Sequence, residues 1–248
     1  MTQKAGKILF RKGRRDPISS TPLSQGVFRA MKGTLGYLGT SIRSLQDHPT
    51  TVCDCGCGLG DLSLFLKPRL GNSYLVGTDL SLVHLRVARR AKYDDVVLCD
   101  VQFLPFRSKA FDCVFCLEVI EHFRKSESIE IISKLTGISR QLIVSTPNGF
   151  RARHIGDTGV SATDSRCKAL GHPINEYHLC GWTSRELRNL GFDVRGSNGL
   201  NFPFLWRRGG EVFLAVSLLV DGFLPDQACT LVASHFDRAM EPGERAGD

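Results

Sequence analysis

Between residues 50 and 147 the sequence alternates short apolar runs with longer amphipathic runs, and this alternation constrains the fold more than any other feature. Strands separated by helices of this length form a parallel sheet whose two faces the helices cover. Ligands of such sheets bind at the carboxyl ends of the strands, so functional residues are expected there and in the following loops. We expect strands over 50–55, 73–80, 94–100, 111–118 and 140–147, and helices over 61–70 (broken at Pro68), 81–92 (capped by Ser81) and 126–138.

The first expected strand runs into a glycine-rich loop, VCDCGCGLG, at residues 52–60. Glycines at positions 56, 58 and 60 let the backbone turn sharply and approach a ligand closely. Asp54, directly before the loop, adds a negative charge. That charge disfavours a phosphate and favours a ligand with a cationic end.

Acidic residues also stand at the ends of the second and third expected strands. Asp79, in VGTDLS, lies nineteen residues after Gly60, where a carboxylate can accept both hydroxyls of a ribose. Asp100, in LCDV, can accept an exocyclic amine of an adenine while the backbone of Val101 meets a ring nitrogen. Three acids at three successive strand ends describe a cationic nucleoside, and S-adenosylmethionine fits that description.

The motifs VCDCGCGLG, VGTDLS, CDVQFLPF, FDCVFCLEVIEHF and LIVSTPNG, in this order and spacing, resemble the class I S-adenosylmethionine-dependent methyltransferases over about residues 50 to 195. The resemblance extends to type 11 and quinone-biosynthesis O-methyltransferases. It implies an α/β fold, a Rossmann-like seven-stranded sheet of order 3-2-1-4-5-7-6 with helices on both faces. The last strand would be antiparallel, and residues 191–196 and 228–235 would supply the last two strands. The cofactor-binding residues that the resemblance implies are Asp54, Gly56, Cys57, Gly58, Gly60, Asp79, Leu80, Asp100, Val101 and Leu117.

Two other classes fit the glycine loop less well. A nicotinamide or flavin enzyme wants the third glycine one residue later, as G-x-G-x-x-G, and Asp54 would repel its pyrophosphate. A non-catalytic relative would bind the cofactor without turnover, but the set of cofactor motifs is intact. The sequence therefore indicates a methyltransferase.

Methyl transfer from a sulfonium is an in-line displacement, so the enzyme aligns a nucleophile and, for a hydroxyl or amine, accepts a proton. We assign His122, which follows the fourth expected strand, and His178, in GHPINEYHLCGW, as the catalytic candidates. His154 and His172 are further candidates for the base. A structural histidine packed under the loop is an equally good interpretation of His122.

The acceptor is expected to be a small molecule, methylated on oxygen, nitrogen or carbon. EVIEHF, STPNG and HLCGWTSRELRNLGFDVRG resemble small-molecule methyltransferases, including those of quinone biosynthesis. Residues 197–226 form an apolar insertion that could cover a hydrophobic acceptor or touch a membrane surface. A helix packed on the sheet is the plainer interpretation of this insertion.

The alternative is an RNA acceptor. Glu118, Glu121 and His122 form E-x-x-E-H, and together with His178 they are similar to the magnesium-dependent small-RNA 3′-end 2′-O-methyltransferases. Two carboxylates and two imidazoles could bind a divalent ion that grips a terminal ribose diol. The chain departs from that family in having HLCGW where the family has Asp-His-x-Phe-Glu-Trp. Nucleic acid is therefore not the favoured partner, and no metal ligand is assigned.

One catalytic domain with an extension at each end is expected from the length of 248 residues. The net charge of +7 only weakly favours an anionic partner, because much of the excess lies in the N-terminal arm. Nothing in the sequence sets the oligomeric state. The expected divisions are a basic arm with a covering helix (residues 24–47) over 1–48, the S-adenosylmethionine-dependent domain over 49–237, and a disordered tail over 238–248.

The nine cysteines do not have the spacing of a zinc site, which usually has pairs separated by two to four residues. Cys53 and Cys55 are expected on one face of their strand as small apolar residues, whereas Cys57 would lie beside the ligand. Free thiols suit a reducing compartment, so a cytoplasmic location is expected. The most apolar run, 212–220, is too short to cross a bilayer, which leaves peripheral membrane contact as the only membrane interaction considered.

Overall fold

A single seven-stranded sheet organises the computed structural model, which describes residues 36–46, 48–149, 178–200, 216 and 219–237. The strand order is β3-β2-β1-β4-β5-β7-β6, as predicted. Strands β1 to β5 pair in parallel, whereas β7 runs antiparallel to both β5 and β6. The strands are β1 (Thr51–Cys55), β2 (Tyr74–Asp79), β3 (Asp95–Leu98), β4 (Phe111–Leu117), β5 (Ser139–Pro147), β6 (Asp193–Leu200) and β7 (Ala228–Phe236).

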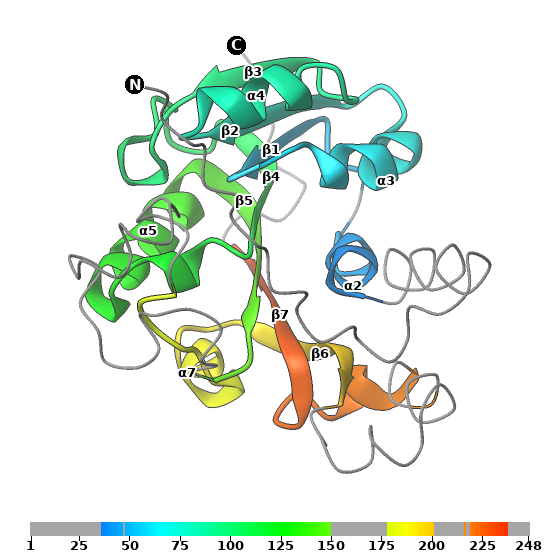
Figure 1. The fold of residues 1–248 in the computed structure, drawn as a ribbon, viewed down its shortest axis with the longest axis vertical. Helices are drawn as coiled ribbons and strands as arrows, with labels where there is room; N and C mark the ends of the chain where they lie inside the picture. Colours follow the sequence, from blue (N-terminus) through cyan, green and yellow to red (C-terminus); the bar gives the residue numbers. More distant parts are fainter. Residues whose placement is uncertain (1–35, 47, 150–177, 201–215, 217–218, 238–248) are drawn as a thin grey trace, which may run out of the picture.

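Helices cover both faces of the sheet (Figure 1). On one face, α2 and α3 pack over Val52 and Phe115, and on the other, α5 and α7 pack over Cys53 and Val114. Neighbouring strand residues thus supply two separate apolar cores, because successive side chains of a strand point to opposite faces. The helices are α2 (Tyr37–Arg43), α3 (Asp61–Leu70), α4 (Leu82–Ala88), α5 (Lys125–Ile138) and α7 (Ser184–Asn189), with single 3₁₀ turns η1 (Val101–Phe103), η2 (Ile120–His122) and η5 (Asp221–Phe223).

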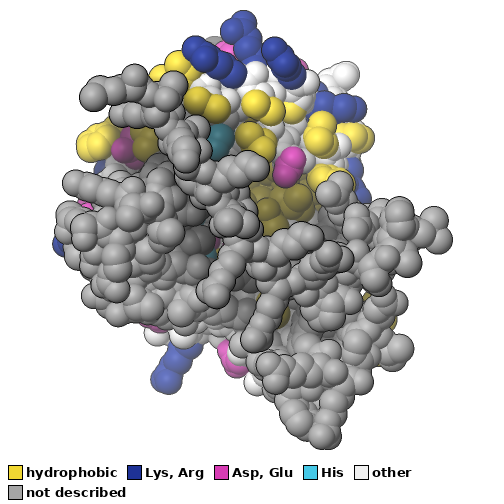
Figure 2. Space-filling view, viewed as in Figure 1, with side chains coloured by type: hydrophobic (Ala, Val, Ile, Leu, Met, Phe, Trp, Pro, Cys, Tyr) yellow, Lys and Arg dark blue, Asp and Glu magenta, His cyan; other side chains and the backbone are white. Residues whose placement is uncertain are grey.

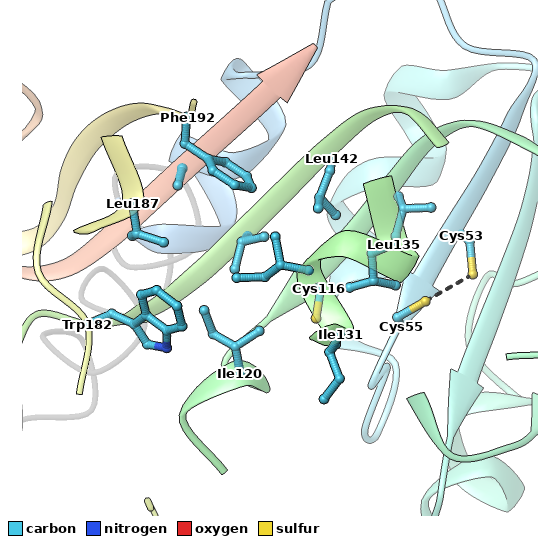
Figure 3. Packing of buried hydrophobic residues seen from close by; sticks show 14 of the residues in the cluster. Cys53, Cys55, Cys116, Ile120, Ile131, Leu135, Leu142, Trp182, Leu187 and Phe192 are labelled. Atoms are coloured by element: carbon cyan, nitrogen blue, oxygen red, sulfur yellow. Dashed lines mark hydrogen bonds between the residues drawn. The ribbon is translucent and has the colours of Figure 1, made fainter. Parts of the chain in front are cut away.

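The core on the α5 face includes two neighbouring free cysteines of β1. Figure 3 shows Cys53 and Cys55 next to one another, and their sulfur atoms lie 3.5 Å apart. Both side chains are fully buried with Ile131 and Leu135 of α5, so their predicted position on one strand face is confirmed. They fill space there as apolar residues.

Three helix predictions need adjustment. The helix over 61–70 is not broken at Pro68, because α3 continues to Leu70; the proline lies in its last turn, where only two more residues follow. The helix after β2 is capped by Ser81, whose side chain accepts from the His84 N–H, but it ends at Ala88 instead of residue 92. Helix α2 occupies the end of the predicted covering helix and lies against β5, β6 and β7.

Several expected segments fall outside the described residues. These are residues 1–35 of the arm, most of the 197–226 insertion and the tail from 238 onward. The domain boundaries that depend on them stay predictions. Within the described ranges, no helix is long and apolar enough to cross a membrane.

Candidate cofactor and acceptor site

The glycine loop after β1 is fixed to the end of the neighbouring strand β2. The backbone N–H groups of Gly56 and Cys57 both donate to the Thr78 carbonyl at 2.8 Å. The N–H of Gly58 donates to Asp79 Oδ2 at 2.9 Å. Because β1 is bonded to β2 on one side and β4 on the other, the loop lies where the strand order reverses, the position at which ligands of such sheets bind.

The three glycines of the loop have different neighbours, although all have positive φ. A Cβ at Gly56 would come within 2.4 Å of Val119 Cγ2, and one at Gly60 would come within 3.0 Å of Ala91 Cβ. A Cβ at Gly58 would meet nothing within 4 Å. Gly56 and Gly60 are therefore required for packing, whereas Gly58 lies beside open space where a ligand can approach the backbone.

Asp54 lies beneath this loop, not in the open. Its side chain is 3% exposed, and the Tyr93 hydroxyl donates a hydrogen bond to Asp54 Oδ2. Burial raises the pKa of Asp54 to about 7, and Asp79 adds to the effect, while the Tyr93 hydrogen bond acts against it. Tyr93 was not identified from the sequence. Its only signal is an aromatic residue in the turn before β3, a place where functional residues are not expected.

Asp79 accepts two backbone hydrogen bonds and lies close to one imidazole. Its Oδ2 accepts from Gly58, and its Oδ1 accepts from the Ser81 N–H at 2.8 Å and lies 3.4 Å from His84 Nδ1. A carboxylate offers about four acceptor positions. The two backbone donors therefore leave Asp79 about two acceptor positions for the predicted ribose hydroxyls, on the side where the imidazole of His84 lies.

At the end of β3, the Asp100 side chain caps η1 by accepting from the Gln102 N–H at 2.8 Å. Large apolar side chains in the loops after β1, β2 and β3 are exposed: Leu59 and Leu80 at 54% and Phe103 at 76%. Exposed apolar side chains at the carboxyl edge suit a flat aromatic ligand. Phe103 was missed from the sequence, although it lies within the quoted motif CDVQFLPF.

Basic side chains gather near α4, at the top of Figure 2. Helix α4 and the turn after it expose Arg86, Arg89 and Arg90. This charge lies on the surface, whereas the buried groups beneath the glycine loop are acidic.

The predicted acceptor-side residues come together after β4. The His122 and His178 rings lie 5.0 Å apart, centroid to centroid, at an angle of 80°. One ligand atom each from Glu121, His122 and His178 lie within 4.8 Å of one another. The N–H groups of Leu179 and Cys180 both donate to the Glu121 carbonyl, and these bonds hold His178 against the turn that carries His122.

The Glu121 carboxyl group is the most unusual feature of this cluster. It is 1% exposed, and neither oxygen has a hydrogen-bond partner among the described residues. Burial, and secondly the charge of Glu118, raise the pKa of Glu121 well above its usual value, although the nearby Thr146 hydroxyl favours the charged form. An unpaired buried carboxyl is costly, so Glu121 is expected to have a partner that the described residues do not supply.

The group of three potential metal ligands does not include Glu118. Its backbone has φ of 55°, an unusual value for a residue other than glycine, and its Oε1 accepts from the Ser145 hydroxyl at 2.8 Å. Figure 3 shows Ile120 and Trp182 in the core beside the turn, and both side chains are buried. The other two base candidates, His154 and His172, lie outside the described residues.

Residues 52–140 match the family model described as a methyltransferase domain. The chain is also similar to a ubiquinone biosynthesis O-methyltransferase of Azoarcus sp., at 27% identity over 61% of this chain and 67% of that protein. It is similar to a malonyl-[acyl-carrier protein] O-methyltransferase of Legionella pneumophila at 37% identity, over 32% of this chain and 29% of the relative.

A third relative is a small RNA 2′-O-methyltransferase of Arabidopsis thaliana, 31% identical over 42% of this chain and 12% of that protein. The chain thus spans less than a third of the length of two of these three relatives. Among solved structures, the plantazolicin methyltransferase in complex with SAH superposes with a TM-score of 0.50 at 18% identity, over 87% of this chain and 90% of the other. That likeness concerns the fold.

Proposed function

This chain belongs to the class I S-adenosylmethionine-dependent methyltransferase superfamily, and we propose that it transfers a methyl group from S-adenosylmethionine to a small-molecule acceptor. When bound, the cofactor supplies a methyl group on a sulfonium, which a nucleophile can attack in line. The protein has to bind the cofactor, align the acceptor and accept a proton. Its described residues fit each of these tasks.

The strand-end residues fit the cofactor. Open space beside Gly58 lets the backbone approach the methionine end, and Asp54 contributes negative charge from below. Asp79 would hold the ribose and Asp100 the adenine, with Val101 at the ring edge. The exposed apolar side chains of Leu80 and Phe103 would cover the adenine and remove their own surface from water.

The single observation that carries the acceptor side is the approach of His122 to His178 beside the end of β4. A pair of imidazoles can share and pass on a proton from an acceptor hydroxyl, which is the work of a general base. Similarity to the ubiquinone biosynthesis O-methyltransferase, of which the chain covers 67%, further supports a small-molecule acceptor methylated on oxygen. The identity of this acceptor is the finer part of the proposal.

The first experiment is calorimetry with S-adenosylmethionine and S-adenosylhomocysteine on the full chain. We expect micromolar or tighter binding of both. Binding of a nicotinamide dinucleotide with no binding of either compound would refute the proposed function. Methyl-labelled cofactor, incubated with the chain and with a cell extract split into small-molecule and RNA fractions, then shows which fraction takes up label.

A second candidate function, metal-dependent 2′-O-methylation of RNA 3′ ends, is favoured by one observation. The Glu121 carboxyl group has no hydrogen-bond partner among the described residues, and it lies close enough to His122 and His178 for the three to bind one metal ion. Nitrogen and oxygen ligands of this kind suit divalent ions, which can grip a pair of neighbouring hydroxyls. Similarity to the plant small RNA 2′-O-methyltransferase supports the same idea.

The two candidates predict different results. If the histidine pair acts as a base on a small molecule, label enters the small-molecule fraction and a chelator leaves the rate unchanged. If a metal grips an RNA end, label enters RNA, the chelator removes activity and a divalent ion restores it. Label in RNA that depends on metal would replace the first candidate by the second.

A further inference from the structure

We infer that Tyr93 is a positioning residue for the cofactor, because its hydroxyl holds the buried Asp54 carboxylate in place beneath the glycine loop. This inference rests on the proposed function, since Asp54 matters for binding only if the ligand has a cationic end. It adds a residue to the site that comes from the turn before β3, not from the carboxyl edge of the sheet.

The first support is the position of the Tyr93 ring. It lies between two glycines, because a Cβ at Gly60 would approach Tyr93 Cε2 to 3.2 Å and a Cβ at Gly77 would approach Tyr93 Cδ1 to 3.1 Å. The absent side chains of the loop and of β2 thus make room for this ring. A ring held on both sides has little rotational freedom, so its hydroxyl is aimed at Asp54.

The second support is that this hydroxyl is the hydrogen-bond partner found for the Asp54 side chain within the described residues. Asp54 belongs to β1 and shares a strand face with Val52, under α3. A carboxylate that accepts a hydrogen bond is stabilised in its charged form. Tyr93 therefore favours the form of Asp54 that attracts a cation.

The other titratable groups around Asp54 do not favour its charged form, so the hydrogen bond from Tyr93 matters. Asp79, at the end of β2, opposes ionisation of Asp54. Asp54 in turn acts on Cys57 in the loop, on Tyr37 of α2, and on the buried thiols of β1 and β4. No cation is among these groups, so the Tyr93 hydroxyl is what favours the charged form before the cofactor arrives.

The consequence is a cofactor affinity that depends on pH near neutrality. The pKa of Asp54 is about 7, so the cofactor-free protein holds this group part protonated at that pH. A cationic amino group binds the charged form, so affinity falls as the pH is lowered through this range. Loss of the Tyr93 hydroxyl raises the pKa of Asp54 further and moves the fall in affinity to higher pH.

The test is the dissociation constant of S-adenosylhomocysteine, measured by calorimetry from pH 6 to 8.5 for the wild type, Tyr93→Phe and Tyr74→Phe. Tyr74 begins β2 and is 51% exposed, so its variant is a matched loss of one tyrosine hydroxyl. We expect Tyr93→Phe to bind at least tenfold more weakly than the wild type at pH 6.5 and within about threefold at pH 8.5. Tyr74→Phe should follow the wild type throughout.

An unchanged pH profile in Tyr93→Phe would overturn the inference, and so would an equal loss of affinity at every pH, which is what a purely structural role predicts. If Tyr93→Phe does not fold, carboxyl-carbon NMR of the wild type decides, because Asp54 must titrate near neutrality; a midpoint near 4 refutes the idea. If the wild type binds no cofactor at any pH, the proposed function fails, and the same NMR titration of the two proteins without cofactor still tests the link between Tyr93 and Asp54.

Discussion

The backbone N–H of Gly58 donates to the carboxylate of Asp79 at 2.9 Å and thereby ties the glycine loop to the end of β2. The carboxylate that we predict to hold the ribose thus also shapes the loop. Replacing Asp79 removes both functions together. The bond also explains why an acid at this position is useful before any ligand is present.

Asp79→Ala should therefore weaken binding of S-adenosylmethionine by about 10- to 100-fold, equivalent to roughly 1–3 kcal/mol for a lost buried hydrogen-bonding group. Calorimetry at pH 8 measures the effect. Asp95→Ala is the control, because Asp95 begins β3 with an exposed side chain that accepts a hydrogen bond from the N–H of the next residue, Val96. Wild-type affinity in Asp79→Ala would show that the end of β2 has been assigned the wrong role.

The parallel sheet and the site edge were predictable from the sequence because strand alternation and strand-end acids are local patterns, whereas the strand order came from the resemblance to a known family. The ten cofactor assignments follow the same logic and stay predictions; their positions lie at the ends of β1, β2 and β4 and in the segments that follow β1, β2 and β3. Tyr93 was not predictable, since its contact with Asp54 joins residues 39 positions apart through a space that two glycines leave open. The different roles of Gly56, in packing, and Gly58, beside open space, were likewise not predictable, because they depend on which atoms lie next to each Cα in the fold.

Substitution of the loop glycines should separate folding from binding. In Gly56→Ala the new methyl would overlap Val119, which lies 2.4 Å away, and would adopt an unfavourable φ, so we expect a loss of about 2–4 kcal/mol in the free energy of unfolding. In Gly58→Ala the methyl meets open space, so stability should fall by only about 1 kcal/mol.

Cofactor affinity should distinguish the two glycines differently from stability. Gly58→Ala is expected to lose at least tenfold in cofactor affinity despite its intact fold, because the methyl occupies the space through which the ligand approaches. Thermal unfolding and calorimetry on the same samples provide the comparison. A Gly58→Ala protein that binds normally would mean that the ligand does not approach the loop at this residue.

Asp54→Asn should stabilise the cofactor-free fold. The pKa of Asp54 is about 7 in the folded chain against a usual value of 3.8, so the folded state binds this proton more tightly than the unfolded state does. The stability contribution of the group is therefore lost as pH rises from about 4 to about 7, by up to roughly 4 kcal/mol at 1.36 kcal/mol per unit. Asparagine mimics the neutral carboxyl and can still accept from Tyr93.

Denaturant unfolding at pH 8 and pH 4.5 measures this effect. The variant should be more stable than the wild type at pH 8, and most of that advantage should be lost at pH 4.5. The same variant should bind the cofactor much more weakly. Equal stability of the two proteins at pH 8 would contradict the burial of a chargeable group at this position, and retained affinity would contradict its part in binding.

If the second candidate function, metal-dependent methylation of RNA 3′ ends, is correct, Glu121, His122 and His178 should bind a divalent ion. Mn²⁺ should then raise the melting temperature of the wild type, because an ion that binds only the folded state stabilises it. His178→Ala should abolish that rise, whereas His48→Ala, at an exposed position between α2 and β1, should keep it. The rise should also vanish at low pH, since the raised pKa of Glu121 keeps this ligand protonated there and protons compete with the metal. If Mn²⁺ does not change the melting temperature at pH 8, the metal-dependent reaction is excluded and the general-base role of the histidine pair is the one that stays.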